Sequence, residues 1–170
     1  MEGIIIFGAK YLIWIALFFA ALVSGAWFYQ TRRWHCIFEA ISAAVLAFIL
    51  SRVAQMFFYN PRPFVSEHFV PLIPHVPDNG FPSDHVLLLA VVALLVWRIS
   101  RKWGMVLLLT AFLVGISRVA AHVHHSVDVA GSLAIALISI AIVRAFFQRF
   151  FPFKNKTPKR RLKESFANAR

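Results

Sequence analysis

Residues 37–59 read IFEAISAAVLAFILSRVAQMFFY and are followed at once by Asn60-Pro61-Arg62-Pro63. The first part is an apolar run of the length, about 20 residues, that a helix needs to cross a bilayer. The two prolines restrict the backbone on both sides of Arg62, which helps to hold its side chain in one place. The stretch therefore predicts a membrane-spanning helix that ends at a rigid polar turn.

Similar apolar runs predict four further helices, over residues 4–29, 83–100, 103–121 and 127–150. The third helix along the chain is the shortest, and we expect its polar start to lie in a wet cavity walled by other helices. Hydrophobic residues make up 60% of the chain, above the average of soluble domains. The sequence thus predicts an all-α integral membrane protein, a bundle of about five transmembrane helices. It predicts one transmembrane domain over 1–153 and a basic tail over 154–170.

The distribution of positive charge predicts the orientation of the bundle. The chain has 18 Lys and Arg against 7 Asp and Glu, a net charge of +11. The basic residues gather in two connections and in the tail, around Arg32, around Arg101 and from Lys154 onward. The positive-inside rule makes that side, with the tail, cytoplasmic. The connection 60–82 and the turn after Ala121 are then expected on the outer, periplasmic face of the cell (inner) membrane.

Six polar residues from three separate stretches are expected at this outer face. They are Arg62, Ser83, His85, Arg118, His124 and Asp128. Polar and ionisable side chains are costly in a membrane protein and are by default candidates for function. Structural residues scattered along the chain would not be expected to converge at one face, so the set predicts a functional site.

The residue types in this set fit the binding of phosphate. Arg62 and Arg118 offer planar forks that match phosphate oxygens, with interfacial snorkelling as the alternative for either one alone. Ser83 follows a proline at the start of a helix, where free backbone N–H groups attract an anion. A plain helix cap is the alternative for this serine.

The remaining three residues fit proton transfer and nucleophilic attack. His124 and Asp128 are four residues apart, a spacing that stacks two side chains on one face of a helix. A carboxylate bonded to one imidazole nitrogen fixes the tautomer and makes the other nitrogen more nucleophilic. His85 supplies a second imidazole, which would protonate a leaving oxygen.

A metal site is the competing interpretation of the closely spaced residues His122, His124 and His125. The chain has no cysteine pair, since Cys36 is alone, and two arginines nearby would repel a cation. We therefore predict no metal and no cofactor, and a non-catalytic His-rich metal- or haem-binding membrane protein stays open as the alternative. The basic tail suits the anionic surface of the bilayer better than nucleic acid, so no nucleic-acid partner is predicted.

These motifs resemble those of the type 2 phosphatidic acid phosphatase superfamily, which shares its fold and site with the vanadium haloperoxidases. The family's third motif is Ser-Arg, five residues, His, three residues and Asp, and it is matched in full by Ser117, Arg118, His124 and Asp128. The Arg-Pro of the first motif and the Pro-Ser-x-His of the second are also present. The undecaprenyl pyrophosphate phosphatase branch looks similar over three stretches, Pro61–Val65, Leu72–His75 and Phe81–His85.

The chain departs from the family pattern at several positions. Asp84 stands where Gly is usual in the second motif, a variant familiar in this branch. The Lys of the first motif falls on Gln55, and Arg52, one helical turn earlier, is expected to reach toward the same site. His75 and Asp78 are expected to be partners of His85 or of the substrate, with local turn bonding as the alternative. The branch usually has a further N-terminal helical segment, so we expect either a short form or an incomplete start.

The resemblance implies a metal-independent membrane phosphatase. It implies that His124 attacks phosphorus and forms a phosphohistidine while Asp128 orients it. It also implies that phosphate is bound by Arg62, Ser83 and Arg118. His85 would protonate the leaving group. The branch implies a polyprenyl lipid substrate, undecaprenyl diphosphate, whose hydrolysis to undecaprenyl phosphate recycles the carrier lipid of peptidoglycan synthesis. A phosphatase for phosphatidic acid or phosphatidylglycerol phosphate would use the same residues and is the alternative; no oligomeric state is predicted.

Overall fold

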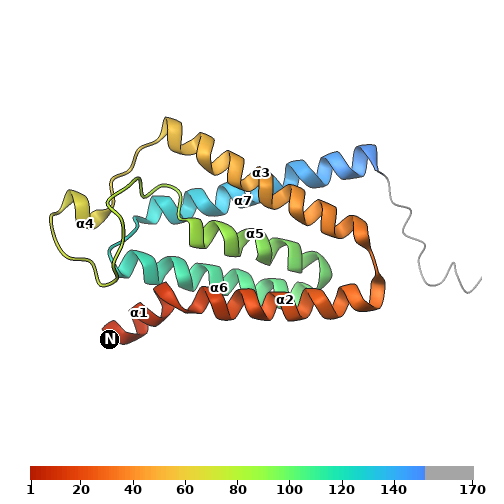
Figure 1. Ribbon diagram of the computed structural model, residues 1–170, viewed down its shortest axis with the longest axis horizontal. Helices are drawn as coiled ribbons and strands as arrows, with labels where there is room; N and C mark the ends of the chain where they lie inside the picture. The colour runs from red at the N-terminus through yellow and green to blue at the C-terminus, as the bar shows by residue number, and fades with distance from the viewer. Residues whose placement is uncertain (152–170) are drawn as a thin grey trace, which may run out of the picture.

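The long apolar runs fold as helices that pack side by side, with polar connections at both ends of the bundle (Figure 1). The computed structural model describes residues 1–151, so the predicted basic tail and its boundary lie outside the described residues. Within this range the predicted all-α bundle is confirmed. Its helices are α1 Glu2–Lys10, α2 Leu12–Thr31, α3 Trp34–Phe57, α4 Pro63–Ser66, α5 Asp84–Ile99, α6 Arg101–Ala120 and α7 Ser126–Phe150.

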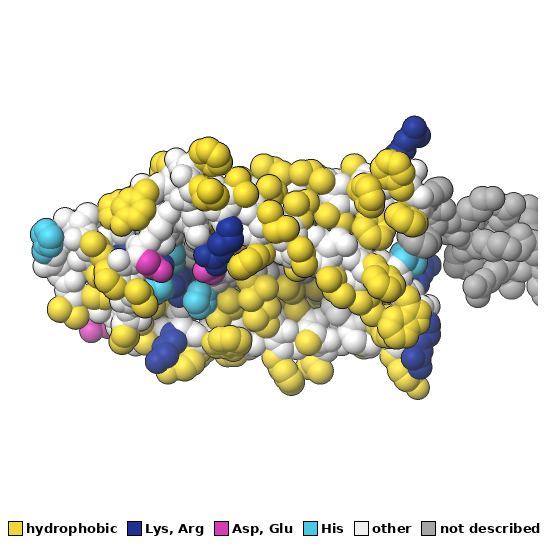
Figure 2. Space-filling model, turned by 45° about the horizontal axis from the view of Figure 1, so that its top comes forward, with side chains coloured by type: hydrophobic (Ala, Val, Ile, Leu, Met, Phe, Trp, Pro, Cys, Tyr) yellow, Lys and Arg dark blue, Asp and Glu magenta, His cyan; other side chains and the backbone are white. Residues whose placement is uncertain are grey.

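Four of these helices, α2, α3, α6 and α7, are long and apolar enough to cross a membrane. Only 17% to 33% of the residues in their most apolar windows are buried inside the protein. Figure 2 shows the consequence, hydrophobic side chains spread over the outside of the bundle. The exposed side chains include Trp14, Phe18, Phe48, Phe112 and Ile138. An apolar surface of this extent is suited to lipid and not to water, so the protein is a multi-pass membrane protein.

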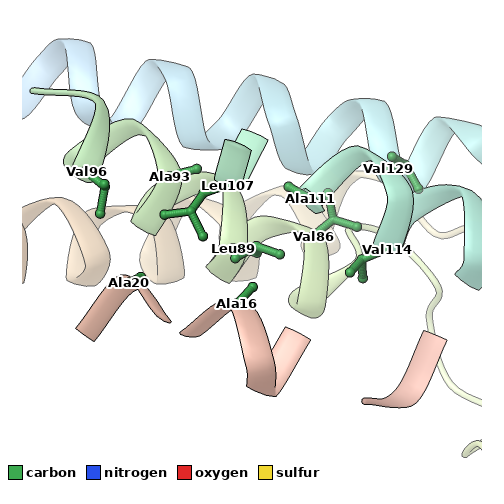
Figure 3. Close-up of a cluster of buried hydrophobic side chains, with 10 residues drawn as sticks. All are labelled: Ala16, Ala20, Val86, Leu89, Ala93, Val96, Leu107, Ala111, Val114 and Val129. Atoms are coloured by element: carbon green, nitrogen blue, oxygen red, sulfur yellow. The ribbon is translucent and has the colours of Figure 1, made fainter. Parts of the chain in front are cut away.

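The fifth predicted helix differs from the other four because it is short and central. α5 has 16 residues, fewer than a full crossing needs, and packs against α2, α3, α6 and α7. Val86, Leu89, Ala93 and Val96 of α5 form a core with residues of α2, α6 and α7 (Figure 3). Because protein surrounds α5 on several sides, its length need not match the thickness of the bilayer. At its polar start Ser83 is buried, whereas Asp84 is exposed.

Small residues let the helices approach closely. Ala16 and Ala20 of α2 and Ala111 of α6 are buried in the same core (Figure 3). A Cβ atom added to Gly115 of α6 would lie 2.7 Å from Cγ1 of Val129 in α7. Van der Waals packing of this kind drives helix association in lipid, where the hydrophobic effect between helices is absent. The close contact also sets the position of the first turn of α7.

The prediction of one continuous helix over 4–29 is wrong. α1 ends at Lys10 and α2 begins at Leu12, so the helix axis breaks at Tyr11. α1 packs against α6, and a Cβ atom added to Gly8 would collide with Oγ of Ser117. Only glycine permits this close crossing of α1 over the end of α6. The hydropathy of residues 4–29 does not reveal it, because the contact is with a distant residue.

The polar connections divide between the two ends of the bundle. The connection 58–83, the turn between α6 and α7, and α1 lie at one end, and the basic connections α2–α3 and α5–α6 lie at the other (Figure 1). The amide of Gly80 donates to the carbonyl of Asn60 at 2.8 Å, and the amide of Leu72 donates to the carbonyl of Ala121 at 3.4 Å. These bonds tie the long connection to itself and to the α6–α7 turn.

Candidate active site

Five of the six predicted site residues are buried together at the end of the bundle that carries the long connection. Arg62 comes from that connection, Ser83 precedes α5, Arg118 ends α6, and His124 and Asp128 flank the start of α7. Each has a relative exposure of 5% or less. Buried polar groups are costly unless they are bonded to one another, and most of these are.

His124 lies at the centre of the network. Its Nδ1 is 2.9 Å from the carbonyl oxygen of Gly80 and 3.3 Å from Oδ2 of Asp128. Both partners are acceptors, so Nδ1 carries the proton and Nε2 carries the lone pair. Nε2 is 3.2 Å from Nη1 of Arg62 and 3.3 Å from Nη2 of Arg118. The unprotonated nitrogen Nε2 therefore lies within hydrogen-bond distance of two guanidinium groups.

Asp128 is held by the cap of α7. Its Oδ2 accepts the backbone N–H of His125 at 2.8 Å, as the N3 partner of a capping box, and its Oδ1 accepts from Nδ2 of Asn60 at 2.8 Å. α7 begins at Ser126, so His124 precedes the helix. Stacking of the pair on one helix face required the helix to begin before His124, and this condition is not met. The pair forms because the capping geometry folds the carboxylate back toward the preceding residues.

The two arginines are positioned by different elements. Nε of Arg62 donates to Oδ1 of Asp78 at 2.8 Å, and its Nη1 donates to the carbonyl of Val123 at 2.8 Å. Burial acts to raise the pKa of Asp78, but the hydrogen bond and the charge of Arg62 outweigh it, and the net shift is downward. The ionised carboxylate thus keeps the fork of Arg62 oriented.

Arg118 is held from the opposite side by α1 and by the long connection. Its Nη1 donates to the carbonyl of Ala9 at 3.1 Å, and its Nη2 lies 2.8 Å from Nε2 of His75. The crossing of α1 over α6 therefore contributes directly to the site. His75 and Asp78 lie against the two arginines, and His75 also interacts electrostatically with His85, one of its predicted partners.

Two buried atoms of the site have no hydrogen-bond partner in the described part of the chain, Oγ of Ser83 and Nε of Arg118. Ser83 occupies the N-cap position of α5, but its side chain makes no capping hydrogen bond. Leaving a buried polar group unpaired costs about 1–3 kcal/mol. Both atoms can donate a hydrogen bond. A tetrahedral oxyanion such as phosphate would provide the missing acceptors and would suit the positive charge of the two arginines.

Four further predicted residues lie around this buried centre: His85, Arg52, Gln55 and Asp84. His85 is in the first turn of α5 and interacts electrostatically with Arg118, His124 and His75. Arg52 contacts both Gln55, at 2.9 Å, and Asp84, at 3.7 Å, so these three residues form a group of their own. Figure 2 shows acidic, basic and histidine side chains gathered near the site end, where they interrupt the hydrophobic surface.

Sequence reasoning missed three groups that shape the site. Asn60 binds Asp128, and its own backbone N–H donates to Oδ1 of Asn79 at 3.0 Å. The Asn-Pro-Arg-Pro motif contains the first of these residues, so its position beside Arg62 was a usable signal. The carbonyls of Gly80 and Ala9 left no such signal, because every residue carries one.

The electrostatics of the site favour the neutral form of two imidazoles, His124 and His75. Burial lowers the pKa of His124, and the hydrogen bond to Asp128 raises it in part. The charges of Arg118 and Arg62 lower the pKa further, so that the net shift is downward. Burial and the charges of the two arginines likewise lower the pKa of His75 to about 4. At neutral pH, therefore, Nε2 of His124 is unprotonated.

The lowered pKa of His124 predicts the acid limb of the pH profile. We expect the limb of kcat/KM that reports this residue to lie below pH 6.5, the ordinary value for histidine. Asp128→Asn removes the interaction that raises this pKa, so the limb moves to still lower pH while the plateau falls. The titration of the substrate phosphate is the same for both proteins. An acid limb that does not move in the variant would assign it to the substrate or to another group.

The three closely spaced histidines do not form a metal-binding cluster in the described residues. In residues 1–151 no group of three or more His, Cys, Asp or Glu side chains could hold a metal ion. His122 is exposed and packs edge-on against Phe69, with ring centroids 5.2 Å apart. Nε2 of His125 lies 3.1 Å from the carbonyl of Pro61. The three neighbouring histidines thus point to three different partners.

A buried imidazole between two guanidinium groups, at one end of a bundle of apolar helices, defines a membrane enzyme of phosphoryl chemistry. The chain belongs to the PAP2 superfamily, whose family model matches residues 36–152. The protein is accordingly a membrane phosphatase of this superfamily, and the family resemblance seen in the sequence is confirmed.

Individual relatives agree with this assignment. The chain is 31% identical to undecaprenyl-diphosphatase BcrC of Bacillus subtilis over 157 residues, which cover 90% of this chain and 78% of the relative. It is 30% identical to an undecaprenyl-diphosphatase of Sulfolobus acidocaldarius over 151 residues, 85% of this chain and 70% of the relative. The fold is similar to the crystal structure of a PAP2-type phosphatidylglycerolphosphate phosphatase from Bacillus subtilis. That match has a TM-score of 0.62 and 24% identity, and covers 89% of this chain and 77% of the other.

Proposed function

We propose that the protein hydrolyses undecaprenyl diphosphate to undecaprenyl phosphate and inorganic phosphate, and so recycles the carrier lipid of peptidoglycan synthesis. The proposed chemistry rests on the position of Nε2 of His124. This nitrogen lies 3.2 Å from Nη1 of Arg62 and 3.3 Å from Nη2 of Arg118. The substrate class is supported by the relatives named undecaprenyl-diphosphatase, each at least 30% identical over most of the chain.

The reaction proceeds in two displacements. Nε2 of His124 attacks the terminal phosphorus, the bond from phosphorus to the bridging oxygen breaks, and a phosphohistidine forms. His85 gives its proton to the leaving phosphate of the lipid. Water, which returns a proton to His85, then cleaves the phosphorus–nitrogen bond and releases inorganic phosphate. Arg62, Arg118 and Ser83 balance the charge on the phosphoryl oxygens in both steps.

The site is proposed to face the outside of the cell membrane. The basic connections between α2 and α3 and between α5 and α6 lie at the end of the bundle opposite to the site (Figure 1). The positive-inside rule puts those connections in the cytoplasm. The predicted cytoplasmic tail is consistent with this orientation, since α7 runs toward the same end as the basic connections.

Phosphate release from purified protein tests this function. With chelator present, we expect kcat/KM for undecaprenyl diphosphate to exceed that for phosphatidic acid and phosphatidylglycerol phosphate by about tenfold or more. Right-side-out vesicles should hydrolyse an added short-chain prenyl diphosphate, and sealed inverted vesicles should not. Faster hydrolysis of the glycerophospholipids would favour the alternative substrate class, and loss of activity with chelator would overturn the metal-independent mechanism.

A further inference from the structure

A second polar cluster lies beside the buried site and is not used by the mechanism above. Nη1 of Arg52, on α3, donates to Oε1 of Gln55 at 2.9 Å, and its Nη2 lies 3.7 Å from Oδ1 of Asp84, the first residue of α5. The guanidinium carbon lies 4.8 Å from the centre of the Phe48 ring. These contacts bridge the two helices at the site end, and we name Arg52, Gln55 and Asp84 the rim cluster.

The rim cluster is open, unlike the buried centre. The side chains of Arg52 and Asp84 have relative exposures of 48% and 64%. An exposed ion pair of this kind contributes little to stability, so it does little to hold α3 against α5. Yet an arginine on an apolar membrane helix is costly and is by default a functional candidate. A cation held loosely by an exposed carboxylate is available to a better anionic partner.

The buried centre has donors suited to one phosphate group. Nε and Nη1 of Arg62 are bonded to Asp78 and Val123, and Nη1 of Arg118 is bonded to Ala9. Unpaired donors remain on Ser83 and on Arg118, whose Nη2 lies 3.3 Å from Nε2 of His124. A diphosphate brings a second charged group, which must lie away from His124 if the leaving oxygen is to depart in line with the attack.

The rim cluster adjoins the buried centre through Asp84, which interacts electrostatically with Arg118. Asp84 stands between Ser83, whose free hydroxyl belongs to the buried centre, and His85, the proposed donor to the leaving phosphate. The guanidinium of Arg52 contacts Asp84 from the exposed side of the site, which we take as the side of the leaving group. In the first motif of the family a lysine is usual at Gln55, and here the cation comes from Arg52 on the same helix instead.

We propose that the rim cluster binds the lipid-side phosphate of a diphosphate substrate and so selects diphosphates over monophosphates. This inference rests on the proposed function. Arg52 exchanges the single contact with Asp84 for a charge-assisted, bidentate contact with the phosphate, and the amide of Gln55 provides a further donor. In the empty enzyme Asp84 keeps the guanidinium beside the site. A lipid with a single phosphate places that group at His124 and leaves Arg52 without a phosphate partner.

The test uses two substrates with the same tail, farnesyl diphosphate and farnesyl phosphate. We expect Arg52→Gln to lower the diphosphate-to-monophosphate ratio of kcat/KM by about 10- to 100-fold, the effect of losing hydrogen bonds to a charged group. Arg52→Lys keeps the charge and should recover part of the ratio. Arg144→Gln, the same change at an exposed position of α7 near the opposite end, is the matched control and should leave the ratio at the wild-type value.

Asp84→Gly tests whether the two residues act as a unit. We expect it to lower the ratio less than Arg52→Gln does, and to add nothing in the double variant, because Asp84 acts through Arg52. An unchanged ratio in Arg52→Gln, or an equal loss on both substrates, would overturn the rim proposal while the proposed function stands. A wild-type protein that hydrolyses the monophosphate and not the diphosphate would overturn both.

Discussion

Replacement of His124 by alanine is expected to abolish turnover, with a loss in kcat on the order of 10⁴-fold or more, because the attacking nitrogen is removed. Nε2 of His124 is the nitrogen that faces both guanidinium groups. Rapid acid-free quenching with a substrate labelled in its terminal phosphate should trap a labelled wild-type protein, whereas His124→Ala should carry no label. The measurement thus reports the covalent intermediate as well as the rate.

The neighbouring His122 provides the matched control for this experiment. It is exposed and has a positive φ of 60°, a conformation that asparagine tolerates better than most residues. His122→Asn should therefore retain wild-type turnover and labelling. Substantial turnover by His124→Ala, or a label that persists in this variant, would assign the nucleophile to another group.

Arg118→Lys is expected to lower kcat by about 10²–10³-fold, although the positive charge is kept. The planar fork of Arg118 reaches three partners at once: the Ala9 carbonyl, His75 and the nucleophilic nitrogen of His124. Its unpaired Nε is a donor that the compact ammonium group of lysine lacks at that position. The loss should therefore appear in kcat, since the phosphoryl oxygens need these donors most in the transition state.

The same substitution at Arg101 is the control for Arg118→Lys. Arg101 begins α6, is exposed and lies at the end of the helix away from the site. Arg101→Lys should leave kcat and KM at their wild-type values. If Arg118→Lys raised KM alone, Arg118 would bind substrate and transition state equally, and its assignment to charge stabilisation in the transition state would be wrong.

Much of the fold was readable because its signals are local. Each long apolar run is helical, although the first is divided into α1 and α2. The Arg-Pro, Pro-Ser and Ser-Arg motifs lie at or near the ends of helices. The break at Tyr11 was not readable, because it depends on the contact between Gly8 and Ser117, which are far apart in the chain. The central position of α5 likewise depends on how the four other helices surround it.

By itself the sequence determined that the protein is a helical membrane bundle and predicted which side chains carry its chemistry, since hydropathy and motif spacing are properties of neighbouring residues. Tertiary structure alone decided how that chemistry is oriented. The carbonyl of Gly80 sets the proton on Nδ1 of His124, and the carbonyl of Ala9 helps to hold Arg118 beside Nε2. Backbone carbonyls are common to every residue, so only their positions in the folded chain distinguish these two from the rest.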